Sequence, residues 1–154
     1  MYTENDLQTI VAQRKRRWIA LLIPVAVLMA VLVASLIFRV QNLTVGATIA
    51  AGALLIAGYD RFIRPVSAYA THVSSMLNGR RREVELPFES LSGDISLVDG
   101  VRFYALKVSD HDEKGKPCDR LFYYDAEKPL PDFREGDMLH IVYHDKGIIS
   151  VAKV

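Results

Sequence analysis

Hydrophobic and charged positions divide the chain into two chemically different halves. Residues 18–38 carry no charged side chain in 21 positions, and residues 40–59 carry none in 20 positions. At a rise of about 1.5 Å per residue, a helix of either length crosses a hydrocarbon core of roughly 30 Å. The pattern therefore predicts two transmembrane helices, placed at residues 18–38 and 42–60, and excludes a wholly soluble globular protein.

The basic residues that flank the two apolar stretches predict their orientation. Lys and Arg near the ends of a span are retained on the cytoplasmic side of the membrane. Positions 14–17 before the first stretch are all basic, and Arg61 and Arg64 follow the second, whereas the short connection offers only Arg39. We therefore expect an antiparallel helical hairpin in a bacterial inner membrane, with both chain termini in the cytoplasm.

The second apolar stretch has a row of small side chains along one helix face. These residues recur at spacings of three and four, at Gly46, Ala50, Ala53 and Ala57. Such a face lets two helix backbones approach closely. Two interpretations follow: the face packs on the first span of the same chain, or it joins several chains into a homo-oligomer.

Amphipathic segments flank the hairpin on both sides. Residues 1–17 form a basic N-terminal arm, in which Thr3 and Asp6 have the spacing of a helix-capping pair. Residues 61–79 have apolar side chains at helix spacing, and Asn78-Gly79 supplies a stop signal, so we expect a linker helix there. This helix is either an interfacial linker or a neck that transmits movement to the spans.

From residue 80 onward the pattern changes to short alternating runs separated by turn residues. These runs predict strands at residues 83–88, 94–98, 101–108, 119–124, 138–143 and 148–153. Asp99-Gly100 between two of them is typical of a tight β-hairpin turn, and Asp145 begins a second turn. Residues 80–154 are thus expected to form a small antiparallel barrel of the OB or SH3-like kind, because closure removes exposed strand edges. The fold class is α+β.

The chain lacks the sequence signatures of common catalytic and metal sites. There is no glycine-rich phosphate loop, no G-x-S-x-G and no H-E-x-x-H, and Cys118 is the single cysteine. His140 and His144 on one strand would stand about 13 Å apart, too far to share one metal ion. We therefore expect no enzyme activity, no catalytic residue, no cofactor and no metal site.

Basic and aromatic residues in the second half are candidates for binding an anionic ligand. Residues 83–154 contain nine basic and fifteen acidic side chains, which argues against binding long nucleic acid. A compact nucleotide in a local pocket is compatible with this balance, with tyrosine rings at 104, 123 and 124 available for stacking. The candidate ligand-binding residues are Arg80, Arg81, Arg82, Arg102, Lys107, His140, Tyr143, His144 and Lys146.

Two spans with cytosolic termini followed by a small β domain resemble the small membrane effectors of CRISPR type III and CBASS antiviral defence. That resemblance implies a cytosolic domain that senses a cyclic oligonucleotide and spans that perturb the membrane. A second resemblance is to short NfeD-like membrane proteins with a C-terminal OB domain. It is carried by residues 136–142 and 148–151, which look like the final hairpin of such a barrel. This alternative implies a membrane scaffold or regulatory subunit whose β domain binds a protein partner.

Overall fold

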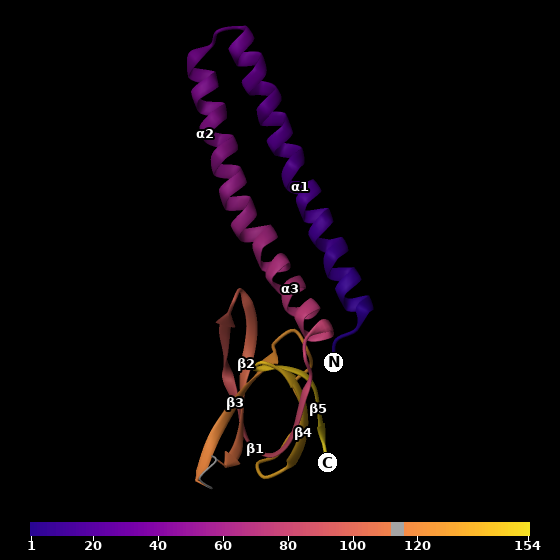
Figure 1. Cartoon of the computed structure of the whole chain (residues 1–154). Coiled ribbons are helices and arrows are strands. Elements are labelled where there is room, and N and C mark those ends of the chain that lie inside the picture. The colour runs from indigo at the N-terminus through magenta and orange to yellow at the C-terminus, as the bar shows by residue number, and fades with distance from the viewer. Residues whose placement is uncertain (112–115) are drawn as a thin grey trace. The chain divides into compact units, whose positions relative to one another are not determined.

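The computed structural model describes residues 1–111 and 116–154 and has an α+β fold (Figure 1). Two compact units are distinguished within it. One is helical and comprises Gln8–Ser67, and the other contains a β-barrel and comprises Met1–Leu7 with Ala68–Val154. The prediction of two long apolar helices followed by a small barrel is confirmed at this level.

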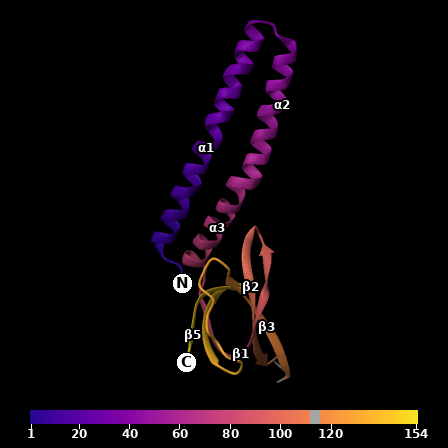
Figure 2. The same cartoon turned by 180° about the vertical axis from the view of Figure 1, so that it is seen from behind.

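The helical unit is an antiparallel hairpin, visible from both sides in Figures 1 and 2. Helix α1 spans Glu4–Ile37 and α2 spans Gln41–Gly58, and Arg39 turns the chain between them with a φ of 57°. The π-helical turn η1 (Tyr59–Ile63) and helix α3 (Arg64–Asn78) follow α2 without a break. The N-terminal arm expected at residues 1–17 therefore shares a single helix with the first apolar stretch.

Small and polar side chains hold the two helices of the hairpin together. The buried residues of α2 are Ala47, Ala51 and Gly58, and a Cβ added to Gly58 would lie 2.3 Å from Cδ1 of Leu21. Near the connection, the hydroxyls of Ser35 and Thr44 are 2.8 Å apart and share a hydrogen bond. The intrachain contact thus uses the small residues of α2 that lie beside the predicted row.

The row of small residues expected to be an association face lies outside this intrachain contact. Gly46, Ala50, Ala53 and Ala57 are all exposed, and a Cβ added to Gly46 would meet nothing within 4 Å. In a single chain the row is therefore accessible to a helix of a second chain.

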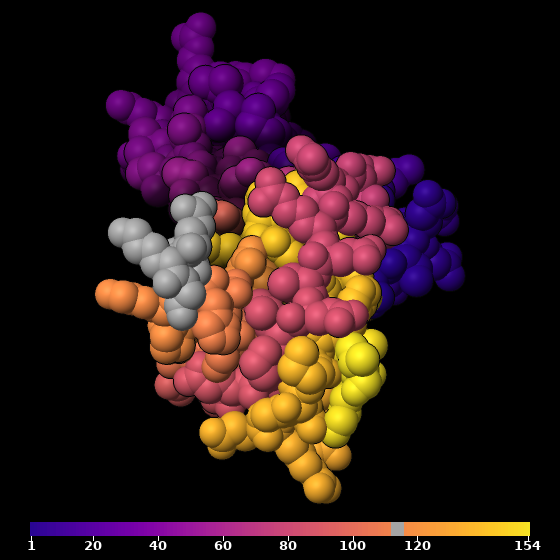
Figure 3. Space-filling view, turned by 60° about the horizontal axis from the view of Figure 1, so that its bottom comes forward, coloured from indigo at the N-terminus to yellow at the C-terminus, as the bar shows by residue number. Residues whose placement is uncertain are grey.

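The barrel is closed by five strands in the order β1-β2-β3-β5-β4. Their bounds are β1 Arg82–Val98, β2 Val101–His111, β3 Pro117–Asp125, β4 Met138–His144 and β5 Gly147–Lys153. All neighbouring pairs are antiparallel except β3 and β5, which meet in parallel at Tyr123 and Gly147. Strands β4 and β5, orange-yellow and yellow in Figure 3, lie side by side on the face shown there.

One strand boundary predicted from the sequence is wrong. The runs predicted at residues 83–88 and 94–98 belong to one long strand, β1, which first pairs with β4 and then with β2. The register shifts between Phe88 and Ser90 and again between Leu91 and Ile95. The polar residues that broke the hydrophobic alternation therefore mark irregularities within a strand, as β-bulges do, and do not end it.

The barrel interior is filled by apolar side chains from all five strands. Among the residues at most 1% exposed are Leu106, Phe122, Leu139, Ile141 and Ile148. They alternate with outward-facing residues along each strand, as the period of two in a β-strand requires. Because this interior is packed, any binding site must lie on the outside of the barrel or at its rim.

The local signals for turns and helix ends are confirmed. Asp99 and Gly100 have φ angles of 51° and 80°, the positive pair that the hairpin prediction required. Thr3 and Asp6 exchange two hydrogen bonds, of 3.1 and 3.2 Å, and cap the start of α1. Helix α3 ends at Asn78 as expected.

Candidate functional site

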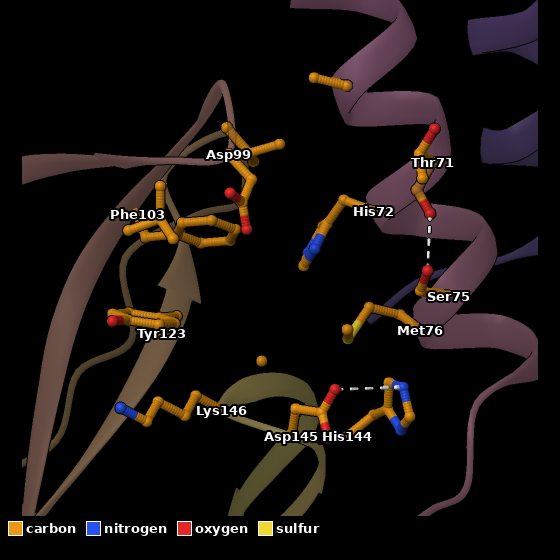
Figure 4. A pocket seen from close by; sticks show the side chains of 14 residues that line it. Thr71, His72, Ser75, Met76, Asp99, Phe103, Tyr123, His144, Asp145 and Lys146 are labelled. Atoms are coloured by element: carbon orange, nitrogen blue, oxygen red, sulfur yellow. Dashed lines mark hydrogen bonds and ion pairs between the residues drawn. The ribbon is translucent and has the colours of Figure 1, made fainter.

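A pocket of about 590 Å³ lies between α3 and the outside of the barrel. Figure 4 shows His72 and Met76 projecting from α3 toward Phe103 and Tyr123 on the strands opposite. The tips of the β1–β2 and β4–β5 hairpins complete the rim. The pocket therefore collects residues from four segments that are far apart in the sequence.

Helix periodicity explains why α3 presents a continuous wall to this pocket. Residues Ala68, Thr71, His72, Ser75 and Met76 all line it. Their spacings of three and four place them on one face of the helix. The hydroxyl of Ser75 donates a 3.0 Å hydrogen bond to the carbonyl of Thr71, which keeps that polar group on the helix surface.

Aromatic rings form the inner surface of the pocket. The centroids of His72 and Phe103 are 4.9 Å apart in an edge-to-face contact, and those of Phe103 and Tyr123 are 5.5 Å apart. Phe103 is buried, while Tyr123 is partly exposed. A planar or apolar group entering the pocket would meet ring faces and edges, which favour such contacts.

The rim carries charges of both signs. Asp99 lies at the tip of one hairpin, and Asp145 and Lys146 lie at the tip of the other. His144 is oriented by its own contacts: Nδ1 is 3.0 Å from the carbonyl oxygen of Arg80, and Nε2 is 3.6 Å from a carboxylate oxygen of Asp145. Two carboxylates beside one ammonium group do not make a site for a highly charged anion.

A fully buried carboxyl group lies at the end of β3, next to the pocket. Oδ2 of Asp125 accepts hydrogen bonds from the hydroxyls of Tyr2, at 3.0 Å, and Tyr69, at 2.7 Å. Its Oδ1 accepts a 2.9 Å bond from the backbone N–H of Glu127. Three donors thus satisfy the carboxyl, as burial demands.

His72 connects this buried cluster to the pocket. Its Nε2 is 3.2 Å from the hydroxyl oxygen of Tyr2. Because Tyr2 gives its single hydroxyl proton to Asp125, Nε2 of His72 must donate to the Tyr2 oxygen. Burial lowers the pKa of His72, and the nearby carboxyl of Asp125 opposes that shift. The same burial, together with Asp125, raises the pKa of Tyr2 and of Tyr69.

Of the nine predicted ligand-binding residues, the pocket brings together only His144 and Lys146. Tyr123, which we expected to stack on a base, also lines it. Tyr143 points into the barrel, and its hydroxyl accepts a 2.7 Å hydrogen bond from Arg120. Adjacent residues of a strand face opposite sides, so Tyr143 and His144 cannot contact the same ligand from one side of β4.

The remaining predicted residues are dispersed over the surface. Arg102 forms an ion pair with Glu127 on the outside of β2. His140 on β4 is 3.5 Å from a carboxylate oxygen of Glu83. Arg80 and Arg81 lie just before β1, Arg82 is its first residue, and Lys107 lies on β2. All four side chains are exposed.

Sequence analysis missed the buried cluster of Tyr2, Tyr69, His72 and Asp125. Tyr69 lies within the predicted linker helix, and Asp125 directly follows the strand predicted at residues 119–124. Tyr2 lies 123 positions from Asp125 in the sequence, and Tyr69 lies 56 positions from it. No local motif links residues so far apart. Within residues 1–111 and 116–154, no group of His, Cys, Asp and Glu has the arrangement of a metal site.

Comparison with protein-family models, with curated proteins and with solved structures finds no match to this chain.

We predict that His72 makes the barrel unit acid-sensitive. Because the pKa of His72 is lower in the folded chain than in the unfolded chain, the unfolded chain binds more protons near pH 6.5 than the folded chain does. The free energy of unfolding should therefore fall as the pH drops through this value. Denaturant titrations between pH 7.5 and 5.5 should show a smaller fall for His72→Gln. The matched variant His111→Gln, at an exposed position, should retain the wild-type fall, and equal falls in all three proteins would contradict the prediction.

Proposed function

We propose that this chain is a non-enzymatic, two-span membrane protein whose barrel is a cytosolic binding module. The strand order, with β3 and β5 in parallel and β1 against β4, resembles a five-stranded OB barrel, in which the loops β1–β2 and β4–β5 border the ligand face. The pocket described above is bordered by the same two loops.

Surface exposure supports insertion of the hairpin in a bilayer. Only 17% of the apolar segment of α1 is buried. The same share of the apolar segment within the helix of residues 41–78 is buried. Ile23, Val27, Ile49 and Ile56 are each at least 60% exposed. Soluble proteins rarely leave so many large apolar side chains uncovered on one surface, whereas lipid would cover them.

The ends of the hairpin support the proposed orientation. Trp18 and Tyr59 lie together with ring centroids 6.1 Å apart, and Arg17 donates a 3.1 Å hydrogen bond to the carbonyl of Phe62. An aromatic pair beside basic residues is typical of the cytoplasmic interface.

We expect the barrel to be protected from outside reagents in intact cells. Cys118 is an exposed natural thiol in the barrel, so a membrane-impermeant maleimide should label it only after the cells are permeabilised. As a control, Asn42→Cys in a Cys118→Ser chain should be labelled in intact cells. Labelling of Cys118 without permeabilisation would refute the orientation.

One observation carries the functional proposal: the pocket wall is part of the helix that also contains the second apolar stretch. Residues 41–78 form an unbroken helix, and its last turns supply His72, Ser75 and Met76 to the pocket. A ligand held there contacts this helix directly. It can change the spans only through a difference in affinity between two of their arrangements.

The pocket lining favours a protein partner over a cyclic oligonucleotide. Aromatic rings, Met76 and two rim carboxylates suit an apolar or basic side chain of another protein. Lys146 is the single Lys or Arg among the described lining residues, whereas a cyclic oligonucleotide presents several phosphates. Nucleotide sensing and a role in antiviral defence stay predictions that rest on the architectural resemblance.

Photo-crosslinking and titration together test this proposal. A photoreactive amino acid at Ser75, which lines the pocket, should give one defined protein adduct in cells that naturally produce the chain. The same amino acid at Lys107, exposed on β2 away from the pocket, should not. If Ser75 gives no adduct but cyclic oligonucleotides bind the full-length chain below 100 μM, a chosen assay limit, with loss of at least tenfold in Lys146→Ala, the nucleotide hypothesis holds. If Ser75 gives no adduct and no cyclic oligonucleotide binds, the pocket is rejected as a binding site.

We also propose that the exposed row of small residues on α2 joins chains into a homo-oligomer. Ala50→Leu should then weaken association in lipid nanodiscs or detergent by roughly 1 kcal/mol, because close packing supplies most of the association energy between membrane helices. Val45→Leu, at an exposed position off this row, is the matched control. Sedimentation or mass photometry showing equal oligomers for Ala50→Leu and wild type would refute the assignment.

A further inference from the structure

We propose that the carboxyl of Asp125 holds the segment before α1 on the barrel through the hydroxyl of Tyr2, and that His72 makes this attachment depend on the occupant of the pocket. The attachment itself stands on geometry alone. Its dependence on the pocket rests on the function proposed above.

The side chain of Tyr2 contacts helix α3, the end of strand β3 and the loop that follows β3. Its side chain is 8% exposed, and its hydroxyl touches both Asp125 and His72. The ammonium group of Lys128 lies 5.4 Å from the centroid of the Tyr2 ring and 3.2 Å from Oδ2 of Asp6. The N-terminal segment is therefore bound by hydrogen bonds, a cation–π contact and an ion pair.

The attachment of Tyr2 also restrains α1, because Tyr2 lies just before the start of that helix. Helix α1 begins at Glu4, and the capping pair Thr3 and Asp6 fixes its first turn. Holding Tyr2 therefore holds the start of the helix that contains the first apolar stretch. The hydroxyl of Tyr69, on α3, donates to the same carboxylate oxygen. The carboxyl of Asp125 therefore attaches both the residues before α1 and helix α3 to the barrel.

The link from the pocket to this attachment is a single side chain. One edge of the His72 ring donates from Nε2 to Tyr2, and the ring packs edge-on against Phe103, which lines the pocket. A ligand that moves His72 removes a donor from the Tyr2 hydroxyl and the ring contact of 5.7 Å between the two side chains. Ligand binding and docking of the N-terminal segment are then linked, each changing the equilibrium of the other by the same factor.

Hydrogen exchange of the full chain in lipid nanodiscs tests the attachment. Tyr2→Phe removes one oxygen atom and keeps the ring, so amides of the N-terminal peptide, including Asp6 and Leu7, should exchange at least tenfold faster. Tyr104→Phe is the matched control, since the Tyr104 hydroxyl makes no hydrogen bond to the described residues, and should leave exchange unchanged. Unchanged exchange in Tyr2→Phe, or equal acceleration throughout the barrel, would overturn the proposal, the latter because it reveals a general loss of stability.

A second experiment tests the dependence on the pocket without a natural ligand. Ser75→Cys in a Cys118→Ser chain is modified with benzyl methanethiosulfonate, which places an aromatic group in the pocket through a mixed disulfide and releases the sulfinate. The adduct should accelerate N-terminal exchange at least threefold when Tyr2 is present and should add nothing in Tyr2→Phe. An equal effect in both backgrounds, or none in either, would refute the coupling. These measurements need no ligand, so they can fail or succeed independently of the crosslinking result.

Discussion

The constraint on which the barrel unit depends is the burial of one carboxyl group, that of Asp125. A buried carboxyl without hydrogen-bond donors is costly, and removing one partner costs more than the hydrogen bond itself was worth. Here the donors come from the second residue of the chain, from α3 and from the backbone just after β3. The arrangement around the pocket therefore requires the segment before α1, helix α3 and strand β3 to be in place together. This requirement explains why Met1–Leu7 belong to the barrel unit although they are more than 60 residues from its next segment.

Local sequence patterns predicted the elements well because each of these patterns expresses a local physical rule. The uncharged stretches of 20 and 21 residues are continuous in the sequence, and the Asp99-Gly100 turn and the Thr3–Asp6 cap each act over a few residues. The β1 strand was divided wrongly because hydrophobic alternation cannot distinguish a bulge from a loop. The buried cluster was invisible for a different reason. Tyr2, Tyr69 and Asp125 form a pattern only after the barrel has closed, and nothing near any one of them identifies the others.

The candidate ligand residues illustrate the limit of reasoning from composition. The nine residues had suitable chemistry, but strand alternation divided them between the interior and the exterior, and acidic partners on the surface engaged three of them. Arg102 and Phe103 are neighbours in sequence, yet one forms a surface ion pair and the other lines the pocket. Residue type therefore suggested what the domain could bind, while the direction of each side chain determined what it presents. A pocket with aromatic walls and a mixed rim replaces the expected cluster of cations.

The arrangement of attachments suggests how a small barrel could serve the binding function proposed above. A barrel interior as fully packed as this one deforms little, so a ligand at its rim has few soft elements to move. The soft elements here are the segments fastened to the outside: the residues before α1 and the face of α3. Their contacts with the barrel include hydrogen bonds, ring contacts, a cation–π contact and an ion pair. Polar contacts of this kind can be exchanged for contacts with a ligand, whereas the packing of the apolar interior cannot. Under the proposed coupling, a rigid barrel with polar attachments at one rim responds to an occupant without unfolding, because the contacts that change are those made by Tyr2, Tyr69 and His72.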